Sequence, residues 1–242
     1  MTTALPALDF WYDFASTYTY PAVERIGTLA DAAGVAVRWR PFLLGPIFQR
    51  QGWGDSPFNV YPAKGAYMWR DLERLCQGYG LPWRRPSRFP QNGLLASRIF
   101  LAGAEGGWCI PFARAVFVAN FVHDRDIADA ATLAEILRGL GQDADAILAE
   151  AQSPEVKLRL REETAEAERR GIFGAPSFTI GTELFWGHDR LEQAIAWAVR
   201  AATPHINPLR PGGGEREGPA QREGEVGADA SNRVNVFPGT KA

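Results

Sequence analysis

The stretch Ala-Leu-Asp-Phe-Trp-Tyr-Asp-Phe-Ala-Ser-Thr-Tyr-Thr-Tyr, from Ala7 to Tyr20, decides the fold. In its first half, apolar residues alternate one by one with other residues, beginning at Leu8 and Phe10. A period of two in mainly aromatic residues predicts a largely buried strand. The next apolar residues recur every three or four positions and predict a helix with one buried face: Val23, Ile26, Ala30 and Ala33.

Ser16 therefore stands where the predicted strand gives way to the predicted helix. Backbone N–H groups in the first turn of a helix have no partner within the helix and carry partial positive charge. A thiolate or another anion beside Ser16 would be stabilised by these groups.

A second strand follows this helix. Gly34 is a suitable helix stop, and the sequence alternates again from Val35 to Phe42. The three segments make a strand, helix, strand unit, which is normally parallel and right-handed.

The composition limits the possible classes of protein. The chain has 242 residues, of which 46% are apolar, so it can bury a real core, and one domain with an insertion is expected. The net charge is −2 without a basic run, which argues against nucleic acid or an anionic membrane as partner. We find no signal-peptide pattern and no apolar stretch of membrane-spanning length, so we expect a cytoplasmic protein without membrane association.

The cysteines and histidines do not form a recognisable site. Cys76 and Cys109 are not in a Cys-x-x-Cys pair, and both are interpreted as small buried hydrophobic residues. The three histidines lie far apart without ligands at metal-binding spacing, so no metal site is expected.

Glycine and proline residues after Phe42 predict a long loop over the end of the sheet. Beyond it, helical periodicity continues without strands, which indicates an inserted helical region. The expected helices span 63–80, 92–103, 109–121, 132–139, 143–151 and 154–170.

Strand signals return after Gly171. Residues 177–180 and 184–186 flank a short turn and predict a hairpin. Asp189, with Glu192 three residues later, has the pattern of a helix N-cap. From about Pro208 the sequence is rich in glycine and charged residues, and we expect disorder there.

The order of a strand, the segment Asp-Phe-Ala-Ser-Thr-Tyr-Thr-Tyr and a helix resembles thioredoxin-fold proteins of the DsbA type. The resemblance is to the branch that holds 2-hydroxychromene-2-carboxylate isomerases and kappa-class glutathione transferases. Redox members of that fold carry a Cys-x-x-Cys pair where this chain has residues 16–19, Ser-Thr-Tyr-Thr. Disulfide exchange at this turn is therefore chemically impossible.

The expected fold class is α/β, a thioredoxin-like fold with an all-helical domain inserted between the second and third strands. The corresponding division gives a thioredoxin-like domain at 7–50 and 171–201, a helical insertion with its preceding loop at 51–170, and a disordered tail at 208–242. The element order comes from the pattern, and the name of the fold comes from the resemblance.

Four motifs carry the resemblance and imply the site. Glutathione is expected at Ser16, at Ala175 and Pro176 of Gly-Ala-Pro-Ser, and at His188 and Asp189 of Gly-His-Asp. In the family this proline is cis and opens a strand, which leaves the backbone of the preceding residue free to pair with an extended peptide. The organic substrate is expected at a second set of residues: Asn59, Lys64 and Phe89.

Each of these residues also has a purely structural interpretation. Ser16 and Asp189 can act only as helix caps, and Pro176 can be an ordinary trans proline. Asn59 and Lys64 can be plain surface residues, and Phe89 can serve packing alone.

The resemblance implies a glutathione-dependent isomerase in aromatic-compound degradation, with Ser16 stabilising the glutathione thiolate and a small aromatic acid as partner. It also implies a homodimer. The chain departs from the isomerase pattern at Thr17 (for Pro), Ala175 (for Val) and His188 (for Asn), which bears on the second substrate more than on glutathione.

Three alternatives stay open at this point. The first is a kappa-like glutathione transferase that conjugates electrophiles. The second is a binding or chaperone-like module that keeps the fold without the chemistry. A serine hydrolase is disfavoured, because no Gly-x-Ser-x-Gly turn is present.

Overall fold

A computed structural model describes residues 5–103 and 106–202. Its sheet has four strands in the order β2-β1-β3-β4; β1 pairs parallel with β2 and antiparallel with β3, and β3 pairs antiparallel with β4. The strands are β1 (Ala7–Tyr12), β2 (Ala36–Pro41), β3 (Ser177–Ile180) and β4 (Glu183–Trp186). The predicted strand, helix, strand unit and the predicted hairpin are both confirmed.

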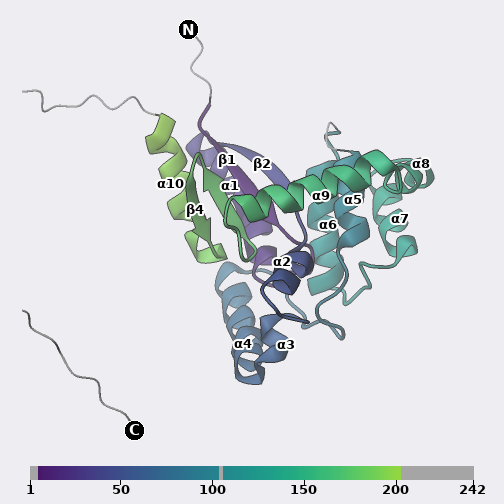
Figure 1. The fold of residues 1–242 in the computed structure, drawn as a ribbon, viewed down its shortest axis with the longest axis horizontal. Helices are drawn as coiled ribbons and strands as arrows, with labels where there is room; N and C mark the ends of the chain where they lie inside the picture. The colour runs from purple at the N-terminus through teal and green to yellow at the C-terminus, as the bar shows by residue number, and fades with distance from the viewer. Residues whose placement is uncertain (1–4, 104–105, 203–242) are drawn as a thin grey trace, which may run out of the picture. The chain divides into compact units, whose positions relative to one another are not determined.

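The alternation in β1 serves two buried faces of the sheet. On one face, Phe10 stacks on Phe178 at a centroid distance of 5.4 Å, within the core that also holds α1 (Thr19–Ala33) and α10 (Leu191–Ala202). On the other face, Trp11 belongs to a smaller cluster with Ala167 of α9 (Pro154–Arg169), and Figure 1 shows α9 crossing the sheet. Burial on both faces explains why β1 is so rich in aromatic residues.

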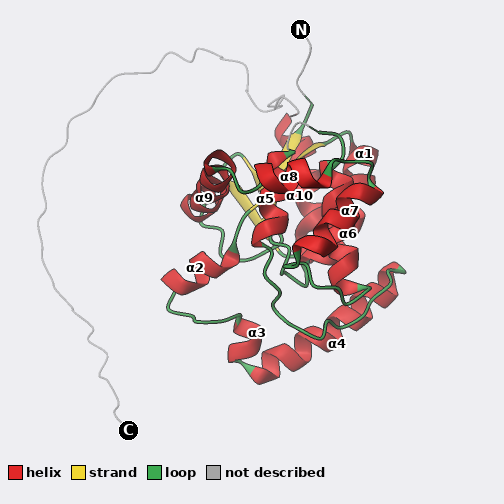
Figure 2. Cartoon of the chain, turned by 90° about the vertical axis from the view of Figure 1, so that its right-hand side faces the viewer, coloured by secondary structure: helices red, strands yellow, loops and turns green. Residues whose placement is uncertain are grey.

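The helices predicted between the second and third strands are present, and all their ends agree to within two residues. They are α4 (Pro62–Tyr79), α5 (Leu94–Ala102), α6 (Cys109–Phe121), α7 (Ala130–Gly139), α8 (Ala144–Glu150) and α9. Helices α4 to α8 contribute to the same hydrophobic core as the strands, whereas α9 contributes to two smaller clusters. Figure 2 shows the strands between α9 on one side and α5 and α8 on the other. The division into a domain and an insertion at the stated boundaries stays a prediction.

The prediction of a long loop after Phe42 is wrong, because two short helices interrupt it. They are α2 (Leu44–Arg50) and α3 (Pro57–Val60). The Ser56 hydroxyl caps α3 by accepting the Phe58 N–H, and proline at the first helical position favours the helix start. The glycines and prolines thus delimit short helices here.

Helices α3 and α4 lie side by side below the sheet in Figure 1. They meet at Gly65, where the β-carbon of any other residue would collide with the Phe58 carbonyl oxygen. This close approach fixes α3, and with it Asn59, against the start of α4.

The prediction of Asp189 as a helix N-cap is also wrong. A single 3-10 turn, η1 (His188–Arg190), runs directly into α10, so Asp189 lies inside helical structure. Gly187 precedes this turn with a φ of 109°, a conformation that favours glycine.

The tail predicted at 208–242 lies outside the described residues. Within the described residues, no helix combines the length and apolar character needed to cross a bilayer.

Candidate functional site

The turn between β1 and α1 brings Ser16 to a segment that is distant in the sequence. The Ser16 hydroxyl donates to the Ala175 carbonyl oxygen at 2.8 Å, across 159 positions of the chain. The Ser16 N–H donates to the Asp13 carbonyl oxygen at 3.0 Å, which closes the turn. Two of the four motifs are therefore in direct contact.

Ala175 and Pro176 form the second part of this site. The peptide bond between them is cis, as the resemblance implies. The Pro176 carbonyl accepts the Gly187 N–H at 2.9 Å, which joins this segment to the start of η1. The Ala175 carbonyl was expected to be free, but it accepts the Ser16 hydroxyl. A carbonyl oxygen has a second lone pair, so one position for a ligand remains.

A buried carboxylate stabilises the turn that carries Ser16. One Asp13 carboxylate oxygen accepts the Ala15 N–H and the other accepts the Leu44 N–H, both at 2.8 Å. Burial raises the pKa of Asp13, and the two N–H donors oppose this shift. Asp13 thus ties the residues before Ser16 to the beginning of α2.

The start of α1 leaves two donors open beside Ser16. The N–H groups of Thr19 and Tyr20 are bonded to carbonyl oxygens within the turn. The N–H groups of Thr17 and Tyr18 have no acceptor among the described residues. Together with the serine hydroxyl, they form a set of donors suited to an anion, at the positive end of a 15-residue helix.

His188 packs on the same turn through Tyr18. Their rings are stacked, with centroids 5.3 Å apart and planes 7° apart. His188 is buried, whereas Asp189 beside it is exposed and pairs with Arg190 at 3.3 Å. The fourth motif thus contacts Tyr18, which follows Ser16 two positions later in the chain.

Burial lowers the pKa of His188, because it disfavours the imidazolium. The carboxylates of Asp189, Asp71 and Glu192 favour the charged form, and Arg25 opposes it. The balance leaves His188 neutral at neutral pH.

This pKa shift predicts a pH dependence of stability. The unfolded chain takes up a proton at His188 near pH 6.5, whereas the folded protein takes it up only at lower pH. The free energy of unfolding should therefore fall more steeply in the wild type than in His188→Asn as the pH drops below about 6.5. Urea unfolding at pH 7.5 and pH 5.5 measures this, with His123→Asn, at an exposed position, as control. Equal pH dependence in wild type and His188→Asn would contradict it.

The residues predicted for the organic substrate form a second group. The Asn59 side-chain amide donates to the Asp55 carboxylate at 3.0 Å and to the Phe89 carbonyl at 3.2 Å. The Phe89 ring packs edge to face on Trp69 of α4, at a centroid distance of 4.9 Å. Asn59 and Phe89 are thus held together, although 30 positions separate them.

Lys64 stands at the start of α4. Its side-chain ammonium lies 5.3 Å from the centre of the exposed Tyr61 ring, and no carboxylate pairs with it among the described residues. An unpaired ammonium remains available to a ligand carboxylate.

Helix α4 links the two groups, which have no direct contact in the described ranges. The Thr17 hydroxyl donates to the Met68 sulfur at 3.1 Å, and the Tyr18 hydroxyl donates to the Asp71 carboxylate at 3.0 Å. The helix that carries Lys64 therefore also contacts the residues directly after Ser16.

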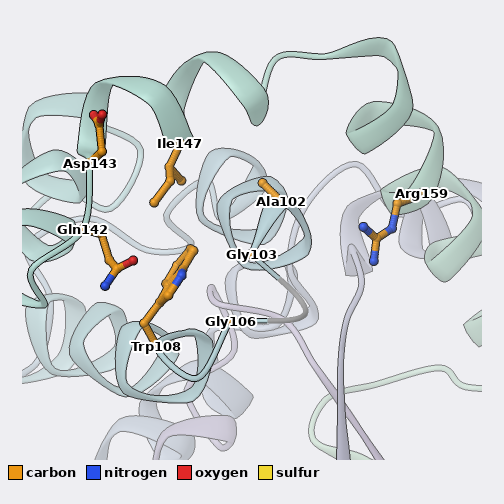
Figure 3. A pocket seen from close by; sticks show the side chains of 8 residues that line it. All are labelled: Ala102, Gly103, Gly106, Trp108, Gln142, Asp143, Ile147 and Arg159. Atoms are coloured by element: carbon orange, nitrogen blue, oxygen red, sulfur yellow. The ribbon is translucent and has the colours of Figure 1, made fainter.

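A pocket of about 450 Å³ lies elsewhere, among α5, α6, α8 and α9 (Figure 3). None of the predicted site residues lines it. Its most prominent lining side chains are Trp108, Gln142 and Ile147. The pocket is therefore separate from the site around Ser16.

The other reactive groups do not converge on a second site. Cys76 and Cys109 are free and buried, and burial raises the pKa of each thiol to about 11. Among the described residues, no group of three or more histidine, cysteine or acidic side chains has the arrangement of a metal site.

Asp13, Tyr18 and Asp71 are parts of the site that sequence reasoning missed. Asp13 belongs to the motif and follows directly on the strand, which was a usable signal. The pairing of Tyr18 with Asp71 spans 53 positions and has no local signature.

The comparisons with known proteins agree with this fold. A family model described as a DSBA-like thioredoxin domain matches residues 7–195. A 2-hydroxychromene-2-carboxylate isomerase of Pseudomonas putida is 30% identical over 76% of this chain and 90% of its own length. Glutathione S-transferase kappa 2 of Caenorhabditis elegans is 27% identical over 84% of this chain and 95% of its own length.

A solved structure of 2-hydroxychromene-2-carboxylate isomerase superposes with a TM-score of 0.73 at 26% identity, covering 81% of this chain and 95% of the other. The matched region contains β1, the Ser16 turn, the helices between β2 and β3, and the hairpin. The chain belongs to the DsbA-like thioredoxin family, in the branch of the 2-hydroxychromene-2-carboxylate isomerases and their kappa-class glutathione transferase relatives.

Proposed function

We propose that this protein is a glutathione-dependent isomerase that interconverts 2-hydroxychromene-2-carboxylate and trans-o-hydroxybenzylidenepyruvate. The observation that carries the proposal is the Ser16 hydroxyl, which stands where redox relatives have a cysteine and contacts the Ala175 carbonyl at 2.8 Å. The identity to isomerases of this name over most of their length supports the choice of reaction. A homodimer in the cytoplasm completes the proposal.

In this proposal glutathione lies along the segment that joins Ser16 to η1. Its cysteinyl backbone pairs with Ala175 next to Pro176, as an extended peptide pairs with a strand edge. Its γ-glutamyl end lies at His188 and Asp189, where the exposed Asp189 carboxylate can hold an ammonium group.

The protein must then favour the thiolate of glutathione over the thiol. A free thiol has a pKa of about 8.5, so it is mostly protonated at neutral pH. The Ser16 hydroxyl has one proton, so it must turn from the Ala175 carbonyl toward the sulfur, beside the open N–H groups of Thr17 and Tyr18. One charge-assisted hydrogen bond is worth about 1.5–3 kcal/mol, equivalent to one to two pKa units.

The reaction uses the thiolate and regenerates it. The ring C–O bond of the hemiketal opens first: the 2-hydroxyl becomes a ketone and its proton goes to the released phenol oxygen, which leaves a cis α,β-unsaturated ketone. The thiolate sulfur then adds to the carbon β to this ketone, forming a C–S bond while the C=C π pair moves into an enolate, and the resulting C–C single bond rotates. The enolate pair re-forms the double bond in the trans geometry as the C–S bond breaks and the thiolate leaves. Glutathione is neither oxidised nor consumed, and the product is an isomer of the substrate.

Asn59, Lys64 and Phe89 hold the organic substrate in this proposal. The Lys64 ammonium pairs with the substrate carboxylate, and the Phe89 ring contacts the aromatic ring.

Replacing Lys64 by methionine should raise KM for the chromene acid by up to about fivefold, because an exposed ion pair contributes at most about 1 kcal/mol. The KM for glutathione should not change. The matched control is Lys157→Met on α9, outside the site, which should leave both constants unchanged. Equal effects of the two substitutions would show that Lys64 does not bind the chromene acid.

A kappa-class-like transferase is the second candidate, since a kappa-class relative matches 95% of its own length. Two assays with glutathione separate the candidates: isomer formation from the chromene acid, and stable conjugate formation from a halogenated nitrobenzene. The proposal expects the first product to dominate. Conjugation alone would favour the transferase, and an absence of glutathione binding at millimolar concentration would favour a binding module without this chemistry.

A further inference from the structure

The side chain of Tyr18 is held by three elements outside its own helix. Its hydroxyl donates to the Asp71 carboxylate of α4 at 3.0 Å. Its ring stacks on His188 of η1 at 5.3 Å and lies 6.1 Å from the Phe58 ring of α3. A side chain with contacts on three sides cannot change rotamer without breaking several of them.

The acceptor of this hydrogen bond is itself fixed. The second Asp71 carboxylate oxygen accepts from the Arg74 guanidinium one turn later, at 3.3 Å. The tyrosine hydroxyl remains protonated across the physiological range, since burial and the neighbouring carboxylate raise the pKa of Tyr18. It is therefore a constant donor to Asp71.

The side-chain anchors of residues 17 and 18 lie on the same helix. Thr17 is bonded to Met68 at 3.1 Å, and Tyr18 is bonded to Asp71 three positions later. The backbone N–H groups of Thr17 and Tyr18 have no acceptor among the described residues. The side chains are thus fixed, while the backbone donors remain open beside Ser16.

Donors stabilise an anion most effectively when their direction is set before it arrives. The direction of each N–H follows the orientation of its peptide plane, which the neighbouring side chains restrain. A loose anchor at residue 18 would let these planes rotate and would weaken the stabilisation of sulfur.

We propose that Tyr18 is a positioning residue which, through its hydrogen bond to Asp71, aims the open N–H groups of Thr17 and Tyr18 at the sulfur of bound glutathione. This inference rests on the proposed function. It assigns to α4 a role in lowering the thiol pKa of bound glutathione, in addition to its role in holding the organic substrate.

Tyr18→Phe removes the hydroxyl and keeps the ring. The thiol pKa of bound glutathione, followed by thiolate absorbance during a pH titration, should rise by about one unit relative to wild type. The affinity for S-methylglutathione, which has no thiol to titrate, should stay within about twofold, because no contact to the tripeptide is removed.

Tyr20→Phe is the matched control. Tyr20 lies two positions after Tyr18, and this variant also removes one phenol hydrogen bond, which Tyr20 donates to the Pro82 carbonyl at 2.8 Å. The bound thiol should titrate in this variant as in wild type. An equal shift in Tyr18→Phe and Tyr20→Phe, or no shift in Tyr18→Phe, would overturn the inference.

Asp71→Ala tests the same link from α4 and serves if Tyr18→Phe does not fold. It should shift the thiol pKa by as much as Tyr18→Phe, and the double variant should shift it no further, because both changes break one interaction. Additive shifts would overturn the role of this pair. If wild-type protein does not bind glutathione, the proposed function fails; if it binds and only the Tyr18 and Asp71 effects are absent, this inference alone fails.

Discussion

Ser16→Ala is expected to lose about 10- to 150-fold in kcat for isomerisation, the equivalent of one charge-assisted hydrogen bond of about 1.5–3 kcal/mol. The loss should fall on kcat, because the hydroxyl acts on the sulfur as negative charge develops and holds no other part of the ligand. The native fold should remain, since only one partly buried hydrogen bond to Ala175 disappears. Steady-state kinetics with glutathione and the chromene acid measure the change.

The control for Ser16→Ala is Thr19→Val. Thr19 lies three positions away in the first turn of α1, and its buried hydroxyl has no hydrogen-bond partner within the described ranges. Valine has the same shape, so this variant should keep wild-type kcat. Full activity in Ser16→Ala would exclude the hydroxyl from the chemistry.

The largest effect on stability is expected for Asp13→Ala. The substitution leaves two backbone N–H donors, those of Ala15 and Leu44, without their acceptors. Each of these partly buried donors costs about 1–3 kcal/mol when it is left unsatisfied, so the free energy of unfolding should fall by about 2–6 kcal/mol. Because Asp13 supports the turn that carries Ser16, activity should fall as well.

Asp129→Ala provides the comparison at an exposed site. Asp129 also accepts two backbone N–H groups, at the start of α7, but water can replace its side chain there. Loss of this exposed cap should therefore lower the free energy of unfolding by less than loss of Asp13. Urea unfolding of both variants should give the larger loss for Asp13→Ala, and only that variant should lose activity. Equal losses of stability in the two variants would show that burial does not increase the contribution of Asp13 to the free energy of unfolding.

The sequence was informative for the strands and longer helices, whose patterns depend on neighbouring residues. The alternation around Phe10, the glycine after α1 and the periodicity of α4 to α9 predicted those elements, since each depends on residues near one another in the chain. The neighbourhood of Ser16 and Pro176 required the resemblance, because their contact spans β1 and the loop before β3.

The errors also have local physical causes. The glycines and prolines between Phe42 and Pro62 predicted a loop, yet Pro57 begins a short helix that Ser56 caps. Asp189 has the composition of an N-cap, but the Arg190 N–H donates to the Gly187 carbonyl, so the helical turn already starts at Gly187. Breakers were recognised in the first case and a capping residue in the second, but their position in the helical element was not.

Contacts between distant elements were beyond sequence reasoning. The anchoring of Thr17 by Met68 and of Tyr18 by Asp71 depends on how α4 packs against the start of α1. Neither residue pair has a spacing that predicts contact. The resemblance supplied the positions of Asn59 and Lys64, and the structure added the helix that connects them to the turn.

The most direct test of the account is the thiol pKa of glutathione bound to the full-length protein, measured by thiolate absorbance against pH in wild type and in Ser16→Ala. The account predicts a value about one to two units below that of the free thiol in the wild type, and a return toward the free value in Ser16→Ala. Bound glutathione that titrates like the free thiol in the wild type, or identically in both proteins, would contradict it.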